Sequence, residues 1–207
     1  MVFDFSNEIK SKGLKILFSN EDTDDFIVDK TEIGMNQIHS NQVKLISSDT
    51  KSIDVTDGIF TIDKNICLTI KTADCLPIFF YNKSPFIIGA IHAGWKGLKD
   101  RIIFNAYDIL QKEVKSLNSI EVLIGPSISQ KNYEVQKDFI SYFGNEFIIE
   151  LNGRYFMSLQ DIAISQLNKI GIMKIKNVNQ CTFENNHFHS FRRNKTKKRL
   201  KGYIYYE

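Results

Sequence analysis

Two short segments of the sequence carry residue types that can do chemistry. Cys75 stands between Asp74 and Leu76-Pro77, and His92 begins the segment His-Ala-Gly-Trp-Lys-Gly. Together with His39, further upstream, they supply two imidazoles and one thiol. Three nitrogen or sulfur ligands are the set of a catalytic zinc site, which keeps its fourth position for water or substrate. The sequence alone leaves open whether they meet, because 36 and 17 residues separate them.

The segment after His92 also offers a place for an anion. Its two glycines permit close approach of the backbone, and a helix beginning near Lys96 would present free N–H groups. Lys71, Arg192 and Arg193 are further candidates, because a guanidinium suits bidentate contact with phosphate. For these three the alternative interpretation is a solvated edge strand.

The elements that must position these residues show two periodicities. Apolar residues at helical spacing predict one long helix over about residues 96–117, and shorter helices are predicted at 135–143 and 158–170. Ser158 with Asp161 is typical of a helix N-terminus. Short β-rich runs predict strands at 14–18, 42–47, 58–62, 66–71, 76–81, 86–92, 119–124, 172–178, 188–191 and 200–206, the last closing a sheet edge. The absence of a regular βαβ rhythm favours an α+β fold.

Composition predicts a single domain over residues 1–207. The content is 43% hydrophobic and 25% charged, which is ordinary for a globular protein, and there is no internal repeat or linker composition. We expect a cytoplasmic protein without a membrane anchor, because the first residues lack a signal-peptide pattern and no apolar run approaches roughly 20 residues. Three cysteines without a Cys-x-x-Cys pair argue against a disulfide framework.

Several further segments occur in a characteristic order along the chain. They are Gln37-Ile-His-Ser40, Thr72-Ala-Asp-Cys-Leu-Pro77, Ala90-Ile-His-Ala-Gly-Trp-Lys-Gly97, Ile124-Gly-Pro126, Tyr133-Glu-Val135, Cys181-Thr182 and Phe188-His-Ser-Phe-Arg-Arg-Asn194. From Gln37 onward the chain closely resembles the laccase-domain family, whose members carry a polyphenol-oxidase name. That family is also described as purine nucleoside phosphorylases and, in some bacteria, as a peptidoglycan editing factor.

The resemblance implies mixed sheets packed in layers between outer helices, with His39, Cys75 and His92 as metal ligands. Zinc is the expected cofactor. Copper ranks below it, because no methionine stands near these blocks of sequence as a weak axial ligand. The expected partners are purine nucleosides and phosphate, and we expect neither membrane nor nucleic acid. The protein should be a monomer or a small homo-oligomer.

The activity implied is phosphorolysis of adenosine, inosine or methylthioadenosine to a free base and ribose 1-phosphate. Phosphate must be held beneath a sugar with oxocarbenium character, and charge growing on the departing base must be neutralised. Lys96, Arg192 and Arg193 are predicted to position phosphate, with Gln37 as a further substrate-binding residue. Cys75 and His92 are also candidate catalytic residues, and Asp74 or the metal would stabilise the leaving purine.

Four alternatives stay open. Adenosine deamination would use a metal-activated water and a proton shuttle, for which Asp74 is the first candidate and Glu134 the second, although either could merely orient a ligand. A metal-free hydrolase or amidase in peptidoglycan precursor editing would use Cys75 as nucleophile and His92 as base. The others are a copper polyphenol oxidase and a non-enzymatic anion or nucleic-acid binder acting through the basic segment 192–201.

Two departures from the family pattern affect these expectations. The N-terminal region is short, because the segment from Asn20 to Asp25 leads almost directly to Gln37, and a loop that covers the substrate is expected to be missing. Lys198 replaces a glycine before Arg199, which would alter the last turn and reposition that arginine.

Overall fold

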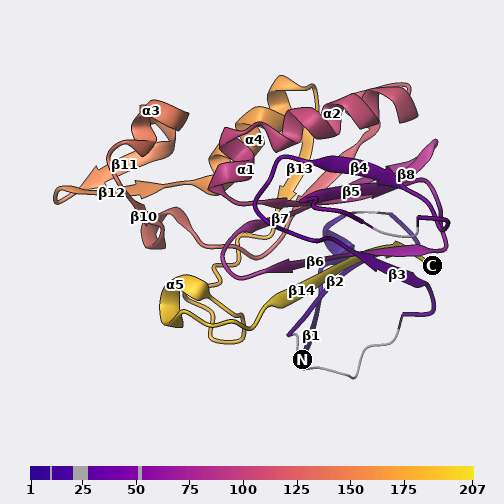
Figure 1. Cartoon of the computed structure of the whole chain (residues 1–207), viewed down its shortest axis with the longest axis horizontal. Coiled ribbons are helices and arrows are strands. Elements are labelled where there is room, and N and C mark those ends of the chain that lie inside the picture. The colour runs from indigo at the N-terminus through magenta and orange to yellow at the C-terminus, as the bar shows by residue number, and fades with distance from the viewer. Residues whose placement is uncertain (10, 21–27, 51–52) are drawn as a thin grey trace.

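Two large β-sheets pack face to face in the computed structural model, which describes residues 1–9, 11–20, 28–50 and 53–207 (Figure 1). The first sheet has six strands in the order β13-β9-β7-β8-β5-β4. Its central strands form an antiparallel hairpin that pairs Leu76 with Ala93 and Pro77 with His92. This register brings Cys75, just before the hairpin, to the sheet end where His92 stands. The strands are β4 (Val43–Ile46), β5 (Gly58–Thr61), β7 (Leu76–Lys83), β8 (Phe86–Ala93), β9 (Glu121–Ile124) and β13 (Lys174–Asn177).

The second sheet has five strands in the order β1-β2-β14-β6-β3. The prediction that residues 200–206 close a sheet edge is wrong, because β14 lies between β2 and β6 and pairs with both. Both partners are far away in the sequence, so local pattern could not reveal this place. The strands are β1 (Val2–Asp4), β2 (Leu14–Asn20), β3 (Thr31–Gly34), β6 (Ile66–Thr72) and β14 (Leu200–Tyr206).

The space between the two sheets is filled by large apolar side chains. Phe18 of β2 meets Phe79 of β7 edge to face, with 5.6 Å between ring centroids. Gly202 lies beneath this pair, and a Cβ there would come within 2.7 Å of Phe18 and 3.0 Å of Phe79. Close packing of this kind requires glycine at position 202.

Helices cover the other face of the six-stranded sheet (Figure 1). They are α1 (Trp95–Lys99), α2 (Ile102–Glu113) and α4 (Leu159–Lys169). The prediction of one continuous helix over 96–117 is wrong, because the structure has two helices there. Arg101 adopts the left-handed region with φ 66°, which breaks the helix after α1. Apolar spacing continues across the break because α1 and α2 both pack on this layer.

The N-terminus of α4 was predicted correctly. Ser158 Oγ accepts a hydrogen bond from the backbone N–H of Asp161 at 3.1 Å, and α4 begins at the next residue after Ser158. This cap satisfies one of the free N–H groups of the first turn.

A small arm projects beside the helical layer, formed by β10 (Glu134–Val135), α3 (Phe139–Phe143), β11 (Ile148–Leu151) and β12 (Arg154–Met157) (Figure 1). The predicted helix at 135–143 is therefore confined to its second half. The strand predicted at 188–191 is wrong, because these residues lead into the short helix α5 (Phe191–Asn194), capped by Ser190.

The observed architecture confirms the α+β class with mixed sheets. Both sheets contain parallel and antiparallel pairs, and the main helices lie on one side of the sheet pair. Among the described residues, no helix combines the length and the apolar character needed to span a membrane.

Candidate metal centre and its cavity

His39, Cys75 and His92 come together at one end of the sheets. Their ligand atoms all lie within 4.8 Å of one another, and Cys75 Sγ lies 3.8 Å from His39 Nε2. His39 stands in the loop between β3 and β4, Cys75 in the bend between β6 and β7, and His92 near the end of β8. A Cβ on Gly94 would lie 3.0 Å from both Cys75 Sγ and His39 Cδ2, so the centre needs a glycine there.

A fully buried carboxylate, Asp57, organises two of the three ligands. Its oxygens accept hydrogen bonds from the backbone N–H groups of Ile38, His39 and Ser40 and from the Ser40 hydroxyl, at 2.6–3.2 Å. Asp57 Oδ1 also lies 2.8 Å from His92 Nδ1. This contact leaves Nε2 as the His92 nitrogen available to a ligand, in the arrangement by which carboxylates orient metal-binding histidines.

The same contacts set the charge state of the metal-free centre. Burial raises the pKa of Asp57, but hydrogen bonds from His92 and Ser40 outweigh burial and lower the pKa to about 2. Burial also opposes ionisation of Cys75 and of His92, yet their mutual attraction lowers the pKa of the Cys75 thiol and raises the pKa of His92. Hydrogen bonding to Asp57 raises the His92 pKa further. Without metal, the pair therefore favours a thiolate beside an imidazolium.

The donor set fits zinc. Tetrahedral zinc with bonds of about 2.0–2.1 Å to nitrogen and 2.3 Å to sulfur separates those two atoms by about 3.5 Å. The separation of 3.8 Å between Cys75 Sγ and His39 Nε2 is close to this value, and all three ligand atoms lie within 4.8 Å of one another. Three protein ligands are the number found in catalytic zinc sites.

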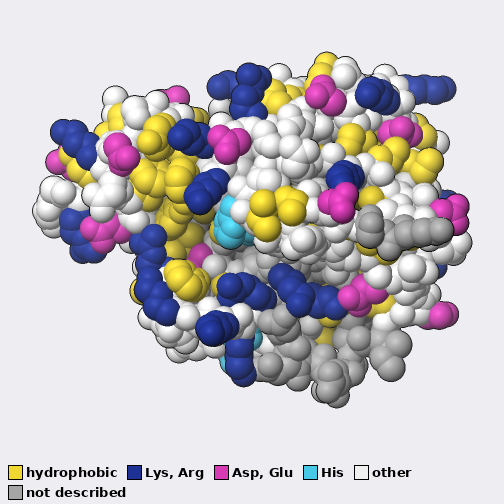
Figure 2. Space-filling view, in the orientation of Figure 1, with side chains coloured by type: hydrophobic (Ala, Val, Ile, Leu, Met, Phe, Trp, Pro, Cys, Tyr) yellow, Lys and Arg dark blue, Asp and Glu magenta, His cyan; other side chains and the backbone are white. Residues whose placement is uncertain are grey.

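The centre opens into a cavity of about 670 Å³. Five apolar or aromatic side chains line it, namely Met35, Ala73, Trp95, Tyr133 and Phe191. Its cationic lining consists of Lys71, Lys96, Arg192, Lys195 and Arg199. Figure 2 shows Lys and Arg side chains and hydrophobic side chains around a hollow in which histidine is exposed. The volume lies within the range of small-molecule sites.

Comparison with known proteins places the chain in a family. Residues 23–207 match the family model described as multi-copper polyphenol oxidoreductase laccase. The chain belongs to this laccase family. A purine nucleoside phosphorylase of Aquifex aeolicus is 37% identical over 165 residues, which cover 79% of this chain and 77% of the relative. A purine nucleoside phosphorylase of Campylobacter jejuni is 34% identical over 173 residues, covering 83% and 75%.

Solved structures of similar fold agree with this assignment to the laccase family. Bacillus licheniformis hypothetical protein YfiH matches with a TM-score of 0.78 at 25% identity, covering 85% of this chain and 74% of that one. YlmD from Geobacillus stearothermophilus matches with a TM-score of 0.83 at 18% identity, covering 95% and 93%, and supports the fold alone.

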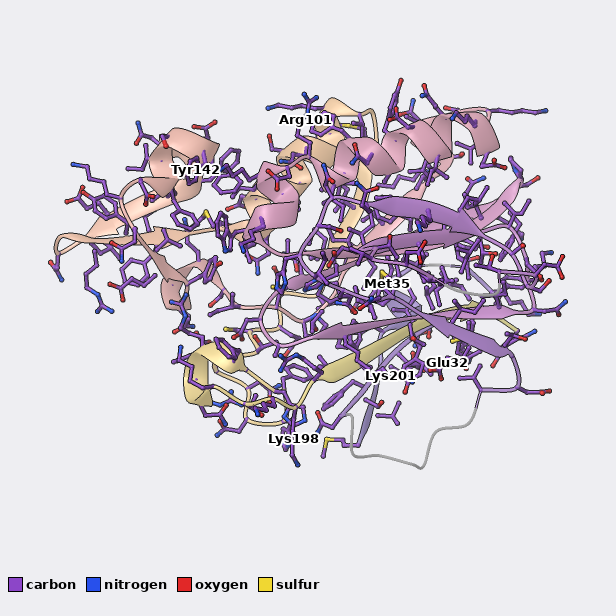
Figure 3. The ribbon with its side chains drawn as sticks, in the orientation of Figure 1. Glu32, Met35, Arg101, Tyr142, Lys198 and Lys201 are labelled. Atoms are coloured by element: carbon purple, nitrogen blue, oxygen red, sulfur yellow. The ribbon has the colours of Figure 1, made fainter. Side chains whose placement is uncertain are left out.

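The family name mentions copper, and one argument against copper needs correction. The sequence was interpreted as having no methionine near the ligand blocks, but Met35 lines the same cavity as the three ligands. It also packs against the core between the sheets, and Figure 3 labels it there. The absence of a neighbouring thioether therefore no longer argues for zinc. The preference for zinc now rests on the ligand count of a catalytic zinc site, and the set of two histidines and one cysteine also fits copper.

Asp74 and Glu134, the predicted proton shuttles, are held by other groups. One oxygen of Asp74 accepts from Thr182 Oγ1 at 2.7 Å, and the other accepts from the backbone N–H of Arg192 at 2.6 Å. The Glu134 carboxylate forms an ion pair with Arg154. These contacts tie Asp74 to the start of α5 and Glu134 to β12, and none of these partners is a proposed metal ligand.

The candidate phosphate-binding residues separate into two groups. Lys96 and Arg192 line the cavity, and the Arg192 guanidinium lies 5.0 Å from the Tyr133 ring while donating one bond to the Glu134 carbonyl. Arg193 is not among the cavity-lining residues. Its guanidinium instead donates to backbone carbonyls at 2.6–2.9 Å, those of Thr182, Phe183 and Phe188. Arg193 therefore stabilises the loop before α5.

Gln37 lines the cavity but its amide is already used. Its Oε1 accepts from the backbone N–H of Lys71 and its Nε2 donates to the Lys71 carbonyl, at 2.9 and 2.8 Å. The side chain thus ties the loop that carries His39 to the end of β6. Its predicted contact with substrate would have to use the remaining lone pair or N–H.

Sequence reasoning missed Asp57 and assigned no individual site role to Lys195 or Tyr133, although both lie in segments that it singled out. No sequence signal marked Asp57, because its burial and its partners arise only in the fold. The expected missing loop falls largely on residues 21–27, outside the described residues. Arg199, beside Lys198, donates to the carbonyls of Thr196 and Lys198, so it is anchored by its own turn.

Proposed function

We propose that the protein is a zinc-dependent purine nucleoside phosphorylase. One observation carries the proposal: the His39–Cys75–His92 cluster opens into the same cavity as cationic side chains suited to phosphate and aromatic side chains suited to a base. The names of the relatives from Aquifex aeolicus and Campylobacter jejuni support the same activity.

Different groups of cavity-lining residues serve different parts of this reaction. Trp95, Tyr133 and Phe191 offer aromatic surfaces on which a purine can stack. Arg192 and Lys96 hold phosphate and place an oxygen near the anomeric carbon, because fixed positive charges stabilise the reacting anion without reorganisation. Asp74 holds the backbone of Arg192 in place. Proximity of the two substrates then lowers the entropic part of the barrier.

His39, Cys75 and His92 would hold the zinc ion, which supplies Lewis-acid stabilisation of negative charge when bound. Asp57 fixes the orientation of His92 and of the loop that carries His39. The centre is partly open, since His39 is exposed whereas His92 is only 4% exposed. A substrate atom can therefore reach the centre from the cavity.

The deciding experiment is a phosphate-dependent assay with adenosine and inosine that detects free base and ribose 1-phosphate. We expect base release to require phosphate, to stop with EDTA and return with zinc, and to be lost in Cys75→Ala. Cys67→Ala is the matched control, because this thiol lies on the outer face of the five-stranded sheet. Formation of inosine from adenosine without phosphate would show that the reaction is deamination and not phosphorolysis.

A second candidate has its own observation. Cys75, His92 and Asp57 form a chain of thiol, imidazole and carboxylate, in which a third group orients the base beside a nucleophile. In metal-free protein this arrangement suits a cysteine amidase acting on a peptidoglycan precursor. Hydrolysis of an amide substrate that survives EDTA and is blocked by iodoacetamide would favour it over the phosphorylase.

A further inference from the structure

Tyr133 stands on the cavity wall, directly before β10, where the arm begins. Its backbone is fixed on both sides, since its N–H donates to the Gln130 carbonyl at 3.0 Å and its carbonyl accepts from the N–H of Met157 at 3.1 Å. The Arg192 guanidinium lies over its ring, 5.0 Å from the centroid. These contacts hold the side chain in place without using its hydroxyl.

The charges that act on the Tyr133 hydroxyl belong to residues of the cavity. Burial, followed by the negative charge of Cys75 and Asp74, raises the pKa of the phenol against the opposing charge of Arg192. All three of these residues line the cavity, so the hydroxyl lies at its metal-binding end. Among the described residues none forms a hydrogen bond with this hydroxyl, although tyrosine hydroxyls in sheltered places usually have a partner. The phenol is therefore a neutral donor that a ligand can use.

The proposed reaction needs a donor beside the departing base. When the C1′–N9 bond breaks, its electron pair passes to the purine, and the negative charge spreads through the five-membered ring to N7. Asp74 was predicted to stabilise this charge, but both of its oxygens already accept hydrogen bonds, from Thr182 and from the N–H of Arg192. A donor at N7 would stabilise the transition state more than the bound substrate, because N7 gains charge only as the bond breaks.

Tyr133 and Arg192 present their donors in different directions. A phenolic hydroxyl lies in the plane of its ring, whereas the guanidinium lies over the ring. Phosphate at Arg192 and a purine that meets the hydroxyl edge of Tyr133 can therefore be bound together, with the purine stacked on Trp95 or Phe191 of the same cavity. During attack the phosphate loses negative charge and the base gains it. The hydroxyl thus contributes more to the rate at the base than at the phosphate.

We infer that Tyr133 is a catalytic residue whose hydroxyl donates a hydrogen bond to N7 of the departing purine. The inference rests on the proposed function. The C1′–N9 bond breaks with its electron pair passing to the base, and an oxygen of hydrogen phosphate forms the new bond to C1′. The purine takes up a proton from solvent, which receives the proton of hydrogen phosphate in exchange, and the other product is ribose 1-phosphate. The phenol keeps its own proton, so it acts as a hydrogen-bond donor and not as an acid.

The test uses Tyr133→Phe, which removes the hydroxyl and keeps the ring beneath Arg192. In single turnovers of the zinc-loaded protein with inosine and saturating phosphate, we expect base release to slow about 100-fold, as when one donor is removed from an oxyanion hole. The inosine and phosphate concentrations that give half the maximal rate should change less than about twofold, because the lost contact belongs to the transition state. Base release at the wild-type rate would overturn the inference.

Tyr142→Phe is the matched control for loss of a tyrosine hydroxyl. Tyr142 lies on α3, is labelled in Figure 3 and is 43% exposed, and it does not line the cavity. This variant should keep the wild-type rate. Urea unfolding of Tyr133→Phe should give the wild-type stability, because its hydroxyl has no partner among the described residues.

A substrate without the N7 lone pair provides a measurement that a merely structural role would not change. 7-Methylinosine cannot accept a hydrogen bond at N7, and its positively charged five-membered ring departs without help from a donor. Tyr133→Phe should therefore release 7-methylhypoxanthine at least as fast as the wild type does. Equal slowing with inosine and with 7-methylinosine would show a general defect of the cavity and overturn the donor role.

Turnover by the wild type separates the two proposals. Phosphate-dependent base release at equal rates by the wild type and Tyr133→Phe would sink the inference and leave the phosphorylase standing. Absence of base release by the wild type from every nucleoside tested would overturn the phosphorylase, and the donor role of Tyr133 with it.

Discussion

Two buried carboxylates hold the site together, and they do so in different ways. Asp57 is far in sequence from the Cys75 and His92 segments, yet it contacts the backbone or ring of two metal ligands. Asp74 stands directly beside Cys75, yet its carboxylate holds Thr182 and Arg192, more than 100 residues later. The difference teaches that adjacency in sequence does not identify which part of a site a residue serves. Asp57 supports the metal centre, and Asp74 supports the cationic wall.

The largest expected effect is that of Asp57→Asn. The amide places a donor against groups that already donate, so the His39 loop and the His92 ring lose their anchor. We expect zinc affinity to fall about 10- to 100-fold, as for other residues that orient metal ligands. The unfolding free energy should fall by about 3 kcal/mol, because buried donors lose an ionised acceptor. Competition with a chromogenic chelator and urea unfolding measure the two changes. Unchanged zinc affinity would contradict the role of Asp57.

Asp74→Asn tests the other half of the comparison. Because the asparagine cannot accept from both Thr182 and Arg192 N–H, the start of α5 should loosen. We expect the KM for phosphate to rise about tenfold and the unfolding free energy to fall by about 2 kcal/mol. Zinc affinity should stay at the wild-type value. A loss of zinc as large as that of Asp57→Asn would show that both carboxylates serve the metal.

The neighbouring arginines provide a matched pair of variants. Arg192→Ala should raise the KM for phosphate about fivefold, since a charge-assisted contact is lost, with little change in stability. Arg193→Ala should lower the unfolding free energy by about 2 kcal/mol, because carbonyls of the loop before α5 lose their donor. Steady-state kinetics and urea unfolding distinguish them. The assignment of Arg192 to phosphate binding and of Arg193 to stability is wrong if Arg193→Ala raises the KM for phosphate and leaves the unfolding free energy at the wild-type value.

Acid unfolding isolates the charge of Asp57. Its folded-state pKa of about 2 lies below its usual value of 3.8, so the unfolded chain takes up the proton first as pH falls. This stabilisation is fully present above about pH 4 and is lost as pH falls towards 2, amounting to about 2 kcal/mol. Urea unfolding of metal-free wild type and Asp57→Asn between pH 5 and 2 measures it. The difference between the two curves should shrink with acidity, and a constant difference would contradict the assignment.

Sequence pattern predicted the strands around the site well and the helices less well. Clear turn signals separate the apolar runs that form β6, β7 and β8. Cys75 and His92 were therefore placed correctly at the ends of strands. The break at Arg101 was invisible, because apolar spacing ignores one left-handed residue between helices on the same layer.

Long-range contacts account for most of what was missed at the site. Whether Arg193 faces a cavity or a ring of carbonyls depends on the path of the loop before it, which carries no periodic signal. The expectation that His39 meets Cys75 and His92 came from the family resemblance. Local pattern could not predict it, because the loop after β3 that carries His39 is held in place by a backbone hydrogen bond to Asp57. Pairing of Asp57 with His92 likewise depends on β5 lying beside β8.

The central place of β14 has a consequence for how the molecule is made. β2 and β6 are synthesised early, but the strand that joins them consists of residues 200–206. Until that segment leaves the ribosome, two long apolar strands present unpaired edges that invite association with other chains. The loop bearing Lys195 and Arg199 is fixed by the same late event. The nascent chain therefore cannot complete its substrate site before residues 200–206 have emerged, and its yield in the cell should depend on protection by chaperones.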